Sequence, residues 1–271
     1  MEKKVILIIL DGWGQTQNPD VSAIYKADTP FFDSLIDEYS NASLRTDGLH
    51  VGLPEGQMGN SEVGHMNLGA GRIVYQDFVK INNAVEDGSL AEQKVLVDAF
   101  SYAKENKKKV HFLGLLSDGG VHSHISHLKG LLDAADNFGL EDVYVHAFTD
   151  GRDVDPKSGK GFVKELQDHM QQSTGQLASI CGRYYAMDRD QRWARVKLSY
   201  DAMVNAIGEK STNAVESVQK SYDEGVTDEF IKPIVMTQSS GEPVAKIEAD
   251  DVIVFFNFRT DRGRQLTRVL T

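Results

Sequence analysis

The sequence predicts an α/β fold built on a largely parallel sheet that is covered by helices on both faces. Two features of the pattern predict it. Short apolar runs alternate with stretches whose apolar residues recur every three or four positions, and each run is followed by a polar cluster. The composition agrees, because 271 residues with 41% hydrophobic and 25% charged side chains suit one large globular domain or two smaller ones.

Five apolar runs are predicted strands, since each is short, rich in valine, isoleucine, leucine or phenylalanine and bounded by polar residues. They are Val5–Leu10, Val110–Leu116, Val143–Phe148, Leu177–Cys181 and Val252–Phe256. None approaches the roughly 20 residues that a membrane-spanning helix needs. The first run follows two lysines, but it is too short for the apolar region of a signal peptide.

Four stretches between these runs have the apolar spacing of amphipathic helices. Thr29 and Pro30 mark the start of the first, Ser89 precedes the second, and Gly139 stops the third. Their apolar faces are marked by Phe32, Leu35, Ile36 and Tyr39; by Val97, Phe100 and Ala103; by Ile125, Leu128, Leu132 and Ala135; and by Trp193, Val196, Tyr200 and Met203.

Charge and cysteine content narrow the functional classes. The net charge of −11, from 29 basic and 40 acidic residues, argues against a nucleic-acid partner and against an anionic membrane surface. The single cysteine, Cys181, cannot form an internal disulfide, so a reducing, cytoplasmic location is expected. Neither a Walker motif nor a dinucleotide fingerprint is present, which leaves nucleotide cofactors without support.

A polar cluster follows each predicted strand directly. Because ligands bind beyond the carboxyl ends of strands in open α/β sheets, five such clusters predict a ligand site, whereas one alone would be a simple turn. The clusters are Asp11-Gly12, Ser117–His122, Thr149–Asp153, Gly182-Arg183 and Asn257–Arg262.

Arginines gather in the second half of the chain, where all but Arg45 and Arg72 follow residue 150. Guanidinium groups bind phosphate and carboxylate in a bidentate manner, so convergent arginines in an acidic protein predict a pocket for a small, multiply anionic ligand. The alternative is a set of solvated arginines paired with Asp153, Asp188, Asp190 and Asp261. The arginines in or next to the clusters are Arg152, Arg183, Arg189, Arg259 and Arg262.

Ser61 lies between a glycine-rich loop and an apparent helix start. Its hydroxyl is either the N-cap of that helix or a nucleophile whose charged form the helix N-terminus stabilises. Asp11 is likewise either a turn residue or a carboxylate ligand of a divalent metal that activates the serine.

Three histidines, His122, His124 and His127, have spacing that a metal site could use, and Asp118 lies one turn from His122. Ligand binding beside the arginines suits them equally well. Cys181 is expected to be a buried small hydrophobic residue. Trp13 and Trp193 are expected in the core or in a pocket wall.

At these residues the sequence resembles the cofactor-independent (2,3-bisphosphoglycerate-independent) phosphoglycerate mutases, which are alkaline-phosphatase-like metalloenzymes. The similarity extends over the whole chain in matching order. It is carried by Leu10–Gly14, Gly52–His65, Leu116–His124, His146–Asp155, Gly182–Arg189 and Phe256–Arg262.

The resemblance implies a two-domain α/β enzyme that interconverts 3- and 2-phosphoglycerate in glycolysis and gluconeogenesis. Residues 1–76 would be the first piece of an alkaline-phosphatase-like metal-binding domain, and residues 77–271 an incomplete inserted substrate-binding domain. It implies two Mn²⁺ or other divalent metal ions, and neither 2,3-bisphosphoglycerate nor a nucleotide. The expected partner is a small-molecule substrate, with no nucleic acid and no membrane, and the expected state is a monomer.

Residue roles also follow from the resemblance. Asp11 corresponds to a metal ligand, and Ser61 to the nucleophile that becomes phosphoserine and also coordinates metal. Asp153 corresponds to the group that exchanges protons with the glycerate hydroxyls. The corresponding substrate-binding set is His122, Arg152, Asp153, Arg183, Arg189, Arg259 and Arg262.

The chain departs from the family's pattern in one respect. The family continues for about as much chain again, and that part supplies most of the metal ligands, so we expect the 271-residue chain alone to be inactive. Two alternatives stay open: a non-catalytic phosphoglycerate-binding fragment, and another metal-dependent phosphomutase or phosphatase of the same superfamily.

Overall fold

The structure is a computed structural model that describes residues 4–16 and 18–271. The chain forms two compact units, Met1–Val79 and Lys80–Thr271, and each is described by itself. The boundary between them falls within helix α4, Asp77–Glu86.

The first unit consists of short helices joined by extended chain. These are α1 Ala23–Lys26, α2 Pro30–Glu38 and α3 Ser61–Ala70, with 3₁₀ turns η1 Pro19–Val21 and η2 Gly48–Val51. Helix α2 begins at Pro30, as predicted, but none of its residues is buried. The buried apolar cluster of this unit is small and consists of Val51, Leu53 and Val63.

The predicted strand Val5–Leu10 is wrong for this structure, because these residues form no regular element. Their side chains are exposed, from 44% at Ile9 to 90% at Val5. A strand needs a neighbour for its N–H and C=O groups, and no segment in the described part of the chain pairs with this run. The apolar pattern is therefore present without the partner that would make it a strand.

The second unit is built on a six-stranded sheet with strand order β4-β5-β3-β2-β1-β6. The β3–β5 pair is antiparallel and every other pair is parallel. Four predicted strands are confirmed as β1, β2, β3 and β6, whereas the three-residue strands β4 and β5 were not predicted. The bounds are β1 Val110–Leu116, β2 Val143–Thr149, β3 Gln176–Gly182, β4 Glu209–Ser211, β5 Ile234–Met236 and β6 Val252–Phe255.

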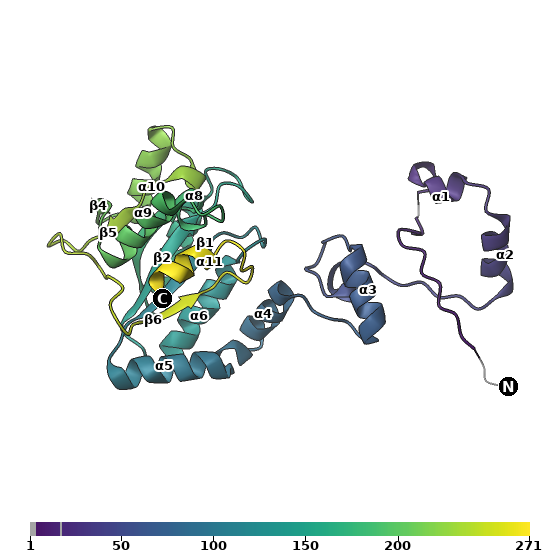
Figure 1. Ribbon diagram of the computed structural model, residues 1–271, viewed down its shortest axis with the longest axis horizontal. Helices are drawn as coiled ribbons and strands as arrows, with labels where there is room; N and C mark the ends of the chain where they lie inside the picture. The colour runs from purple at the N-terminus through teal and green to yellow at the C-terminus, as the bar shows by residue number, and fades with distance from the viewer. Residues whose placement is uncertain (1–3, 17) are drawn as a thin grey trace. The chain divides into compact units, whose positions relative to one another are not determined.

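Helices cover both faces of this sheet, which confirms the predicted α/β layering (Figure 1). Strand β1 shows how the sequence achieves it, since alternate residues point to opposite faces. Phe112 and Leu116 pack with α5, α6, α7 and α10, while Leu113 and Leu115 pack with α8, α9 and α11. The helices are α5 Lys94–Asn106, α6 Ile125–Phe138, α7 Gly159–Met170, α8 Arg183–Ala186, α9 Trp193–Val204, α10 Ala214–Asp223 and α11 Arg264–Leu270, with 3₁₀ turns η3 Ser89–Glu92 and η4 Asp228–Phe230.

Helix ends follow the local signals in the sequence. Gly139 ends α6 with a left-handed φ of 75°, a conformation that glycine adopts without strain. The predicted helix after Ser89 is instead divided into η3 and α5, because Gln93 between them has an extended backbone. Across the described residues, we find no helix with the length and apolar content needed to cross a membrane.

A buried chain of hydrogen-bonding side chains crosses the neighbouring strands β1, β2 and β3. His111 Nδ1 lies 3.0 Å from His146 Nε2, and His146 Nδ1 lies 2.7 Å from Ser179 Oγ. His111 Nε2 lies 3.2 Å from the carboxylate of Asp251, which can only accept a hydrogen bond. Burial, above all, lowers the pKa of His111 to about 4 and the pKa of His146 well below its usual value. Both imidazoles are therefore neutral near pH 7.

Cys181 on β3 is 2% exposed and packs in the apolar cluster with α8, α9 and α11, as the sequence predicted. Its Sγ lies 3.3 Å from Ser199 Oγ, and burial raises the pKa of the thiol to about 12. The side chain is therefore an unreactive core residue.

Candidate functional site: an arginine-lined anion pocket and a serine–aspartate pair

Four polar clusters meet where the parallel strands β1, β2, β3 and β6 end, because parallel strands present their carboxyl ends at one edge. Asp150, after β2, joins several of them. Its carboxylate accepts hydrogen bonds from Ser117 Oγ at 2.7 Å and from Arg183 Nη1 at 2.6 Å. It also accepts the backbone N–H groups of Arg152 and Asp153 at 3.2 and 3.0 Å. Asp150 thus fixes the conformation of the loop after β2.

Arg183 is a buried cation shared between two carboxylates. One of its nitrogens, Nη1, donates to Asp150 Oδ1 and to Asp153 Oδ2, the latter at 2.5 Å. Burial alone would lower the pKa of Arg183 and raise that of Asp150, yet the hydrogen bonds reverse both shifts. The charged forms of this pair are therefore the stable ones.

Four of the predicted arginines line one cavity of about 260 Å³. They are Arg152, Arg183, Arg189 and Arg262. Burial, and then repulsion from the other three arginines, lowers the pKa of Arg262. Arg262 donates to the carbonyl of Met187 at 3.2 Å and forms no ion pair with a carboxylate in the part of the chain that the structure describes. The cavity therefore has positive charge that an anion would neutralise.

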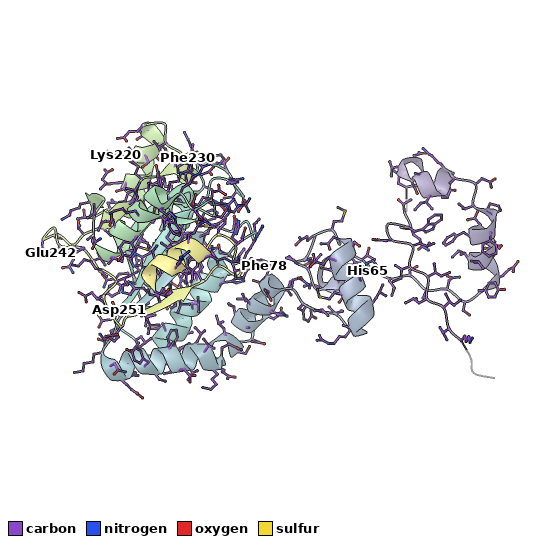
Figure 2. The ribbon with its side chains drawn as sticks, in the orientation of Figure 1. His65, Phe78, Lys220, Phe230, Glu242 and Asp251 are labelled. Carbon is purple, nitrogen blue, oxygen red and sulfur yellow. The ribbon has the colours of Figure 1, made fainter. Side chains whose placement is uncertain are left out.

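The wall of this cavity also contains Arg195, Glu229 and Phe230, which the sequence did not indicate. The Arg195 guanidinium lies 3.7 Å from the ring centre of Tyr184, and Arg195 Nη1 lies 3.8 Å from Asp188. The ring of Phe230, labelled in Figure 2, packs against Tyr184 at 5.1 Å. Glu229 faces Arg152 at 3.7 Å. A guanidinium stacked on an aromatic ring keeps its edge available for an anion.

Arg259, the fifth predicted arginine, does not line this cavity but a neighbouring hollow of about 510 Å³. It is connected to the cavity through Asp261. Arg259 Nε lies 3.0 Å from Asp261 Oδ1, and Arg189 Nη1 lies 3.1 Å from Asp261 Oδ2. Although burial raises the pKa of Asp261, these arginines lower it below its usual value.

His122 lies between two carboxylates and is 3% exposed. Its Nε2 is 3.8 Å from Asp153 Oδ2, and its Nδ1 is 3.9 Å from Asp261 Oδ1. Burial, followed by the charge of Arg183, lowers the pKa of His122 to about 4. The imidazole is therefore neutral near pH 7 in this structure.

The structure does not bring the three histidines together as metal ligands. His124 is the N-cap of α6 and accepts the N–H of Ser126, while His127 Nε2 lies 2.6 Å from Asn82 Oδ1. Across residues 4–16 and 18–271, no three acidic, histidine or cysteine side chains gather where they could hold a metal ion. The alternative histidine metal site is therefore wrong.

In the first unit, Ser61 and Asp11 are in contact. The N-cap of α3 is Asn60, whose side chain accepts the N–H of Val63, so Ser61 is the first helical residue and the N-cap alternative is wrong. Ser61 Oγ donates to Asp11 Oδ2 at 2.6 Å and lies 3.3 Å from His65 Nδ1. The pair opens into a cavity of about 480 Å³ within this unit. A hydroxyl placed here lies at the positive end of the α3 dipole.

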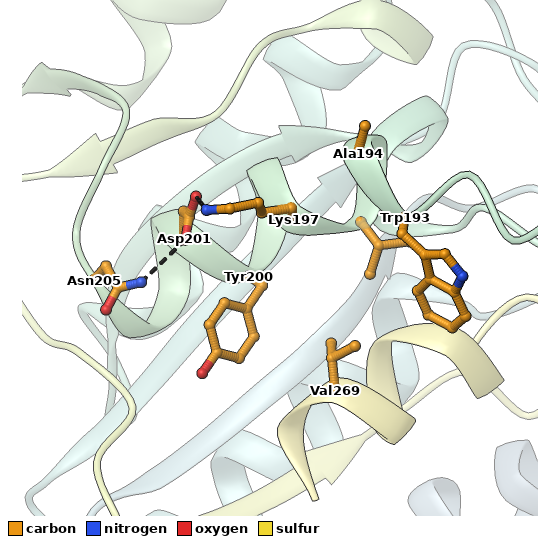
Figure 3. Close-up of a pocket in the computed structure, with 8 residues that line it drawn as sticks. Trp193, Ala194, Lys197, Tyr200, Asp201, Asn205 and Val269 are labelled. Carbon is orange, nitrogen blue, oxygen red and sulfur yellow. Dashed lines mark hydrogen bonds and ion pairs between the residues drawn. The ribbon is translucent and has the colours of Figure 1, made fainter.

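A fourth hollow, of about 540 Å³, lies between α9 and α11 and has a mainly apolar lining (Figure 3). Trp193, Tyr200 and Val269 give it an apolar lining, and its charged group Lys197 is paired with Asp201. Trp193 is thus a pocket-wall residue, 40% exposed. This hollow lacks the unpaired positive charge of the arginine cavity.

Comparison with known proteins decides the family. Residues 81–271 match the family described as "BPG-independent PGAM N-terminus". The chain belongs to this family. It is 65% identical over all its residues to the 2,3-bisphosphoglycerate-independent phosphoglycerate mutase of Flavobacterium johnsoniae, and 56% identical to that of Bacteroides fragilis. These alignments cover 54% and 53% of the two relatives, so the chain spans about half their length.

A solved structure of the phosphoglycerate mutase family has the same architecture. Leishmania mexicana phosphoglycerate mutase, crystallised at low cobalt concentration, superposes with a TM-score of 0.72 at 32% sequence identity. The match covers 90% of this chain and 46% of the other. The fold predicted from the resemblance is thereby confirmed.

The mutase resemblance implies divalent metal ions, and Asp11 and Ser61 can be tested as their ligands. Their two oxygens, 2.6 Å apart, are hard donors of the kind that Mn²⁺ accepts. His65 Nδ1, 3.3 Å from Ser61 Oγ, is the nearest further donor. Even with it, the donors are too few for tight binding of two ions, and no three acidic, histidine or cysteine side chains gather to hold a metal among the described residues. These residues therefore do not form a complete metal site.

Proposed function

We propose that the chain supplies the nucleophile and the substrate pocket of a 2,3-bisphosphoglycerate-independent phosphoglycerate mutase, an isomerase that interconverts 3- and 2-phosphoglycerate. One observation carries the proposal: Arg152, Arg183, Arg189 and Arg262 line one cavity, and Arg262 has no carboxylate partner among the described residues. A ligand with both a phosphate and a carboxylate would supply the missing negative charge. The names of the relatives supply glycerate as the carrier of those groups.

Ser61 is the proposed nucleophile. Its oxygen attacks phosphorus, the bond from phosphorus to the glycerate oxygen breaks, and phosphoserine and glycerate result. The serine proton has Asp11 as its nearest acceptor, at 2.6 Å. Attack by the other glycerate hydroxyl on phosphoserine then breaks the bond from phosphorus to Ser61 Oγ. The serine oxygen takes its proton back, and the isomerisation is complete.

Asp153 is the proposed proton carrier for glycerate. In its protonated form it gives a proton to the glycerate oxygen that leaves phosphorus, and it regains one from the glycerate hydroxyl that attacks. Its Oδ2 contacts Arg183 at 2.5 Å, which places this carboxylate beside the arginine cavity. His122, Arg152, Arg183, Arg189, Arg259 and Arg262 are the proposed substrate-binding residues.

The remaining assignments complete the proposal. Residues 1–76 belong to a phosphatase-like metal-binding domain and residues 77–271 to the substrate-binding domain. The reaction uses two divalent ions, Mn²⁺ by preference, whose ligand sets need residues beyond the Asp11–Ser61 pair. The protein acts in the cytoplasm as a monomer on small molecules, without 2,3-bisphosphoglycerate or a nucleotide.

Calorimetric titration of the 271-residue chain with 3-phosphoglycerate tests the pocket. We expect saturable binding that persists in a chelator, and a loss of about 10- to 100-fold in affinity for Arg262→Met, because one charge-assisted contact is removed. Arg72→Met, at an exposed position of the first unit, is the matched control and should bind like the parent chain. Absence of binding, or equal loss in both variants, would contradict the proposal.

Catalysis is tested separately. The chain alone should show no mutase activity with Mn²⁺, because most metal ligands are missing, and full activity at about 30 kDa would refute that expectation. Peptide mass spectrometry after incubation with 3-phosphoglycerate and Mn²⁺ measures phosphorylation of Ser61. In a complete mutase of this sequence we expect phosphorylated Ser61, and Ser61→Ala should retain 3-phosphoglycerate binding but lose turnover.

A further inference from the structure

Among the described residues, two buried polar atoms near the arginine cavity have no hydrogen bond and face each other, although one of them, the Asp261 oxygen, lies 3.0 Å from Arg259 Nε in an ion pair. They are His122 Nδ1 and Asp261 Oδ1, 3.9 Å apart. That distance is too long for a hydrogen bond. Because buried polar atoms are nearly always hydrogen-bonded, a small approach of these two groups would give His122 Nδ1 the partner that it lacks here.

In this structure, two carboxylates and two arginines act on His122 with opposite effects on its protonation. Asp153 and Asp261 face its two ring nitrogens at 3.8 and 3.9 Å, and each would favour an imidazolium. Arg183 and Arg259 lie near it and oppose that charge. Both carboxylates are engaged elsewhere, Asp153 with Arg183 and Asp261 with Arg189 and Arg259. The imidazole is consequently left without a hydrogen bond to either carboxylate.

An anion in the cavity would change this balance. Arg183 and Arg189 both line the cavity, so a bound phosphate or carboxylate competes with Asp153 and Asp261 for their guanidinium groups. Each carboxylate that loses part of its positive partner exerts a stronger attraction on a proton at His122. Both act on the same ring from opposite sides.

We infer that anion binding in the arginine cavity is coupled to protonation of His122, whose two N–H groups then donate to Asp153 and Asp261. The proton comes from solvent, and no bond in the ligand is made or broken. The inference rests on the proposed function for the ligand and makes Asp261, which the sequence indicated only as a possible arginine partner, a positioning residue. The imidazolium would bridge the loops after β1, β2 and β6 around the occupied cavity.

Nitrogen NMR of the ¹⁵N-histidine-labelled chain tests the coupling, since an imidazolium and a neutral imidazole have distinct ring signals. His122 is assigned by its loss in His122→Asn. In the free chain at pH 6, we expect a neutral ring, because its pKa is about 4. In the chain saturated with 3-phosphoglycerate, both nitrogens should carry protons, which requires the His122 pKa to rise by roughly two units or more.

Substituting Asp261, with an exposed carboxylate as the control, separates this coupling from a purely structural role of Asp261. Asp261→Asn keeps the shape but removes the charge, so the rise in the His122 pKa on binding should be smaller. Asp168→Asn makes the same change at an exposed carboxylate paired with Lys164 and should leave the rise unaltered. Equal rises in both variants would overturn the role of Asp261.

The outcomes also distinguish the inference from the proposed function. Saturable 3-phosphoglycerate binding with His122 neutral throughout would overturn the coupling and leave the proposed substrate intact. A protonated His122 in the free chain at pH 6 would likewise overturn it. If 3-phosphoglycerate does not bind at all, the proposed substrate fails and the inference fails with it.

Discussion

The two units differ in how much apolar surface they bury, although both contain apolar runs of strand length. In Lys80–Thr271, the run Val110–Leu116 is completely buried between two layers of helices. In Met1–Val79, the run Val5–Leu10 is exposed and forms no strand. The difference teaches that an apolar run specifies a strand only where a neighbouring strand and a covering layer are available.

Polar chemistry differs in the same way. The second unit holds buried ionisable groups in networks, such as Asp150 with Arg183, whose charges the surrounding atoms tune. The first unit presents Ser61 and Asp11 as an exposed pair. We expect the second unit to respond to substitution and pH as a cooperative body and the first to respond locally.

Acid should produce the largest contrast between the units. His111, His122 and His127 have pKa values lowered to about 4, with burial as the main cause, against 6.5 for an unfolded histidine. Below pH 6.5 the unfolded chain binds protons that the folded unit excludes, so stability falls between pH 6.5 and about 4 and changes little from these groups below that. Each histidine should contribute a loss of about 3 kcal/mol.

Urea unfolding at several pH values, followed by circular dichroism, measures this loss. His127→Gln should reduce the pH dependence by about one proton between pH 6.5 and 4. The histidines of the first unit, His50 and His65, are exposed, and substituting His50 by Gln is the matched control that should leave the slope unchanged. A flat stability profile across this range would contradict the burial of neutral imidazoles.

Removing a phenylalanine ring should distinguish the units next. Phe112 on β1 is 0% exposed, so Phe112→Ala should lower the free energy of unfolding of the second unit by about 3–5 kcal/mol. Phe31 on α2 is 77% exposed, and Phe31→Ala should change the free energy of unfolding of the first unit by less than about 0.5 kcal/mol. Similar losses from both substitutions would show that the first unit has a core after all.

Removing a helix N-cap should give the smallest effect on stability. It also compares the two units by the same substitution at the same kind of position. Asn60 caps α3 and Asn213 caps α10, each by accepting a backbone N–H, of Val63 and Glu216 respectively. Asn213→Ala should cost the second unit about 1 kcal/mol of unfolding free energy. Asn60→Ala should leave global unfolding unchanged and speed amide exchange within α3 only, because that helix buries a single side chain, Val63. A global loss from Asn60→Ala would contradict local folding of the first unit.

The sequence predicted the layers of the second unit well because its strands are long and its helices strongly periodic. Strand β1 and helix α6 lie where apolar spacing and Gly139 placed them. Strands β4 and β5 were missed because three residues are too few to show a pattern, and Glu209–Ser211 is polar. The prediction of a strand at Val5–Leu10 was wrong for the opposite reason. Its apolar pattern was clear, but no strand in the described part of the chain pairs with it.

The sequence predicted the type of site, an anion pocket, but not which carboxylates its arginines would contact. Arginines after strand ends indicated an anion pocket, and four of them line one cavity. Their carboxylate partners could not be ranked from sequence, because Asp261 and Asp150 look like ordinary turn residues. Arg195 was missed because it lies within helix α9, and only tertiary packing places it over Tyr184. The signal that could have indicated Arg195 is its closeness in sequence to the polar loop after β3, which contains Arg183 and Arg189.

The burial of Cys181 has a practical consequence. Its thiol is the single one in the sequence, is 2% exposed and has a pKa raised to about 12 by burial, so alkylating dyes should leave the native chain unmodified. A cysteine introduced at an exposed position would then be the sole attachment point for a fluorophore or spin label. The sequence therefore needs no cysteine removed before a single spectroscopic label is attached.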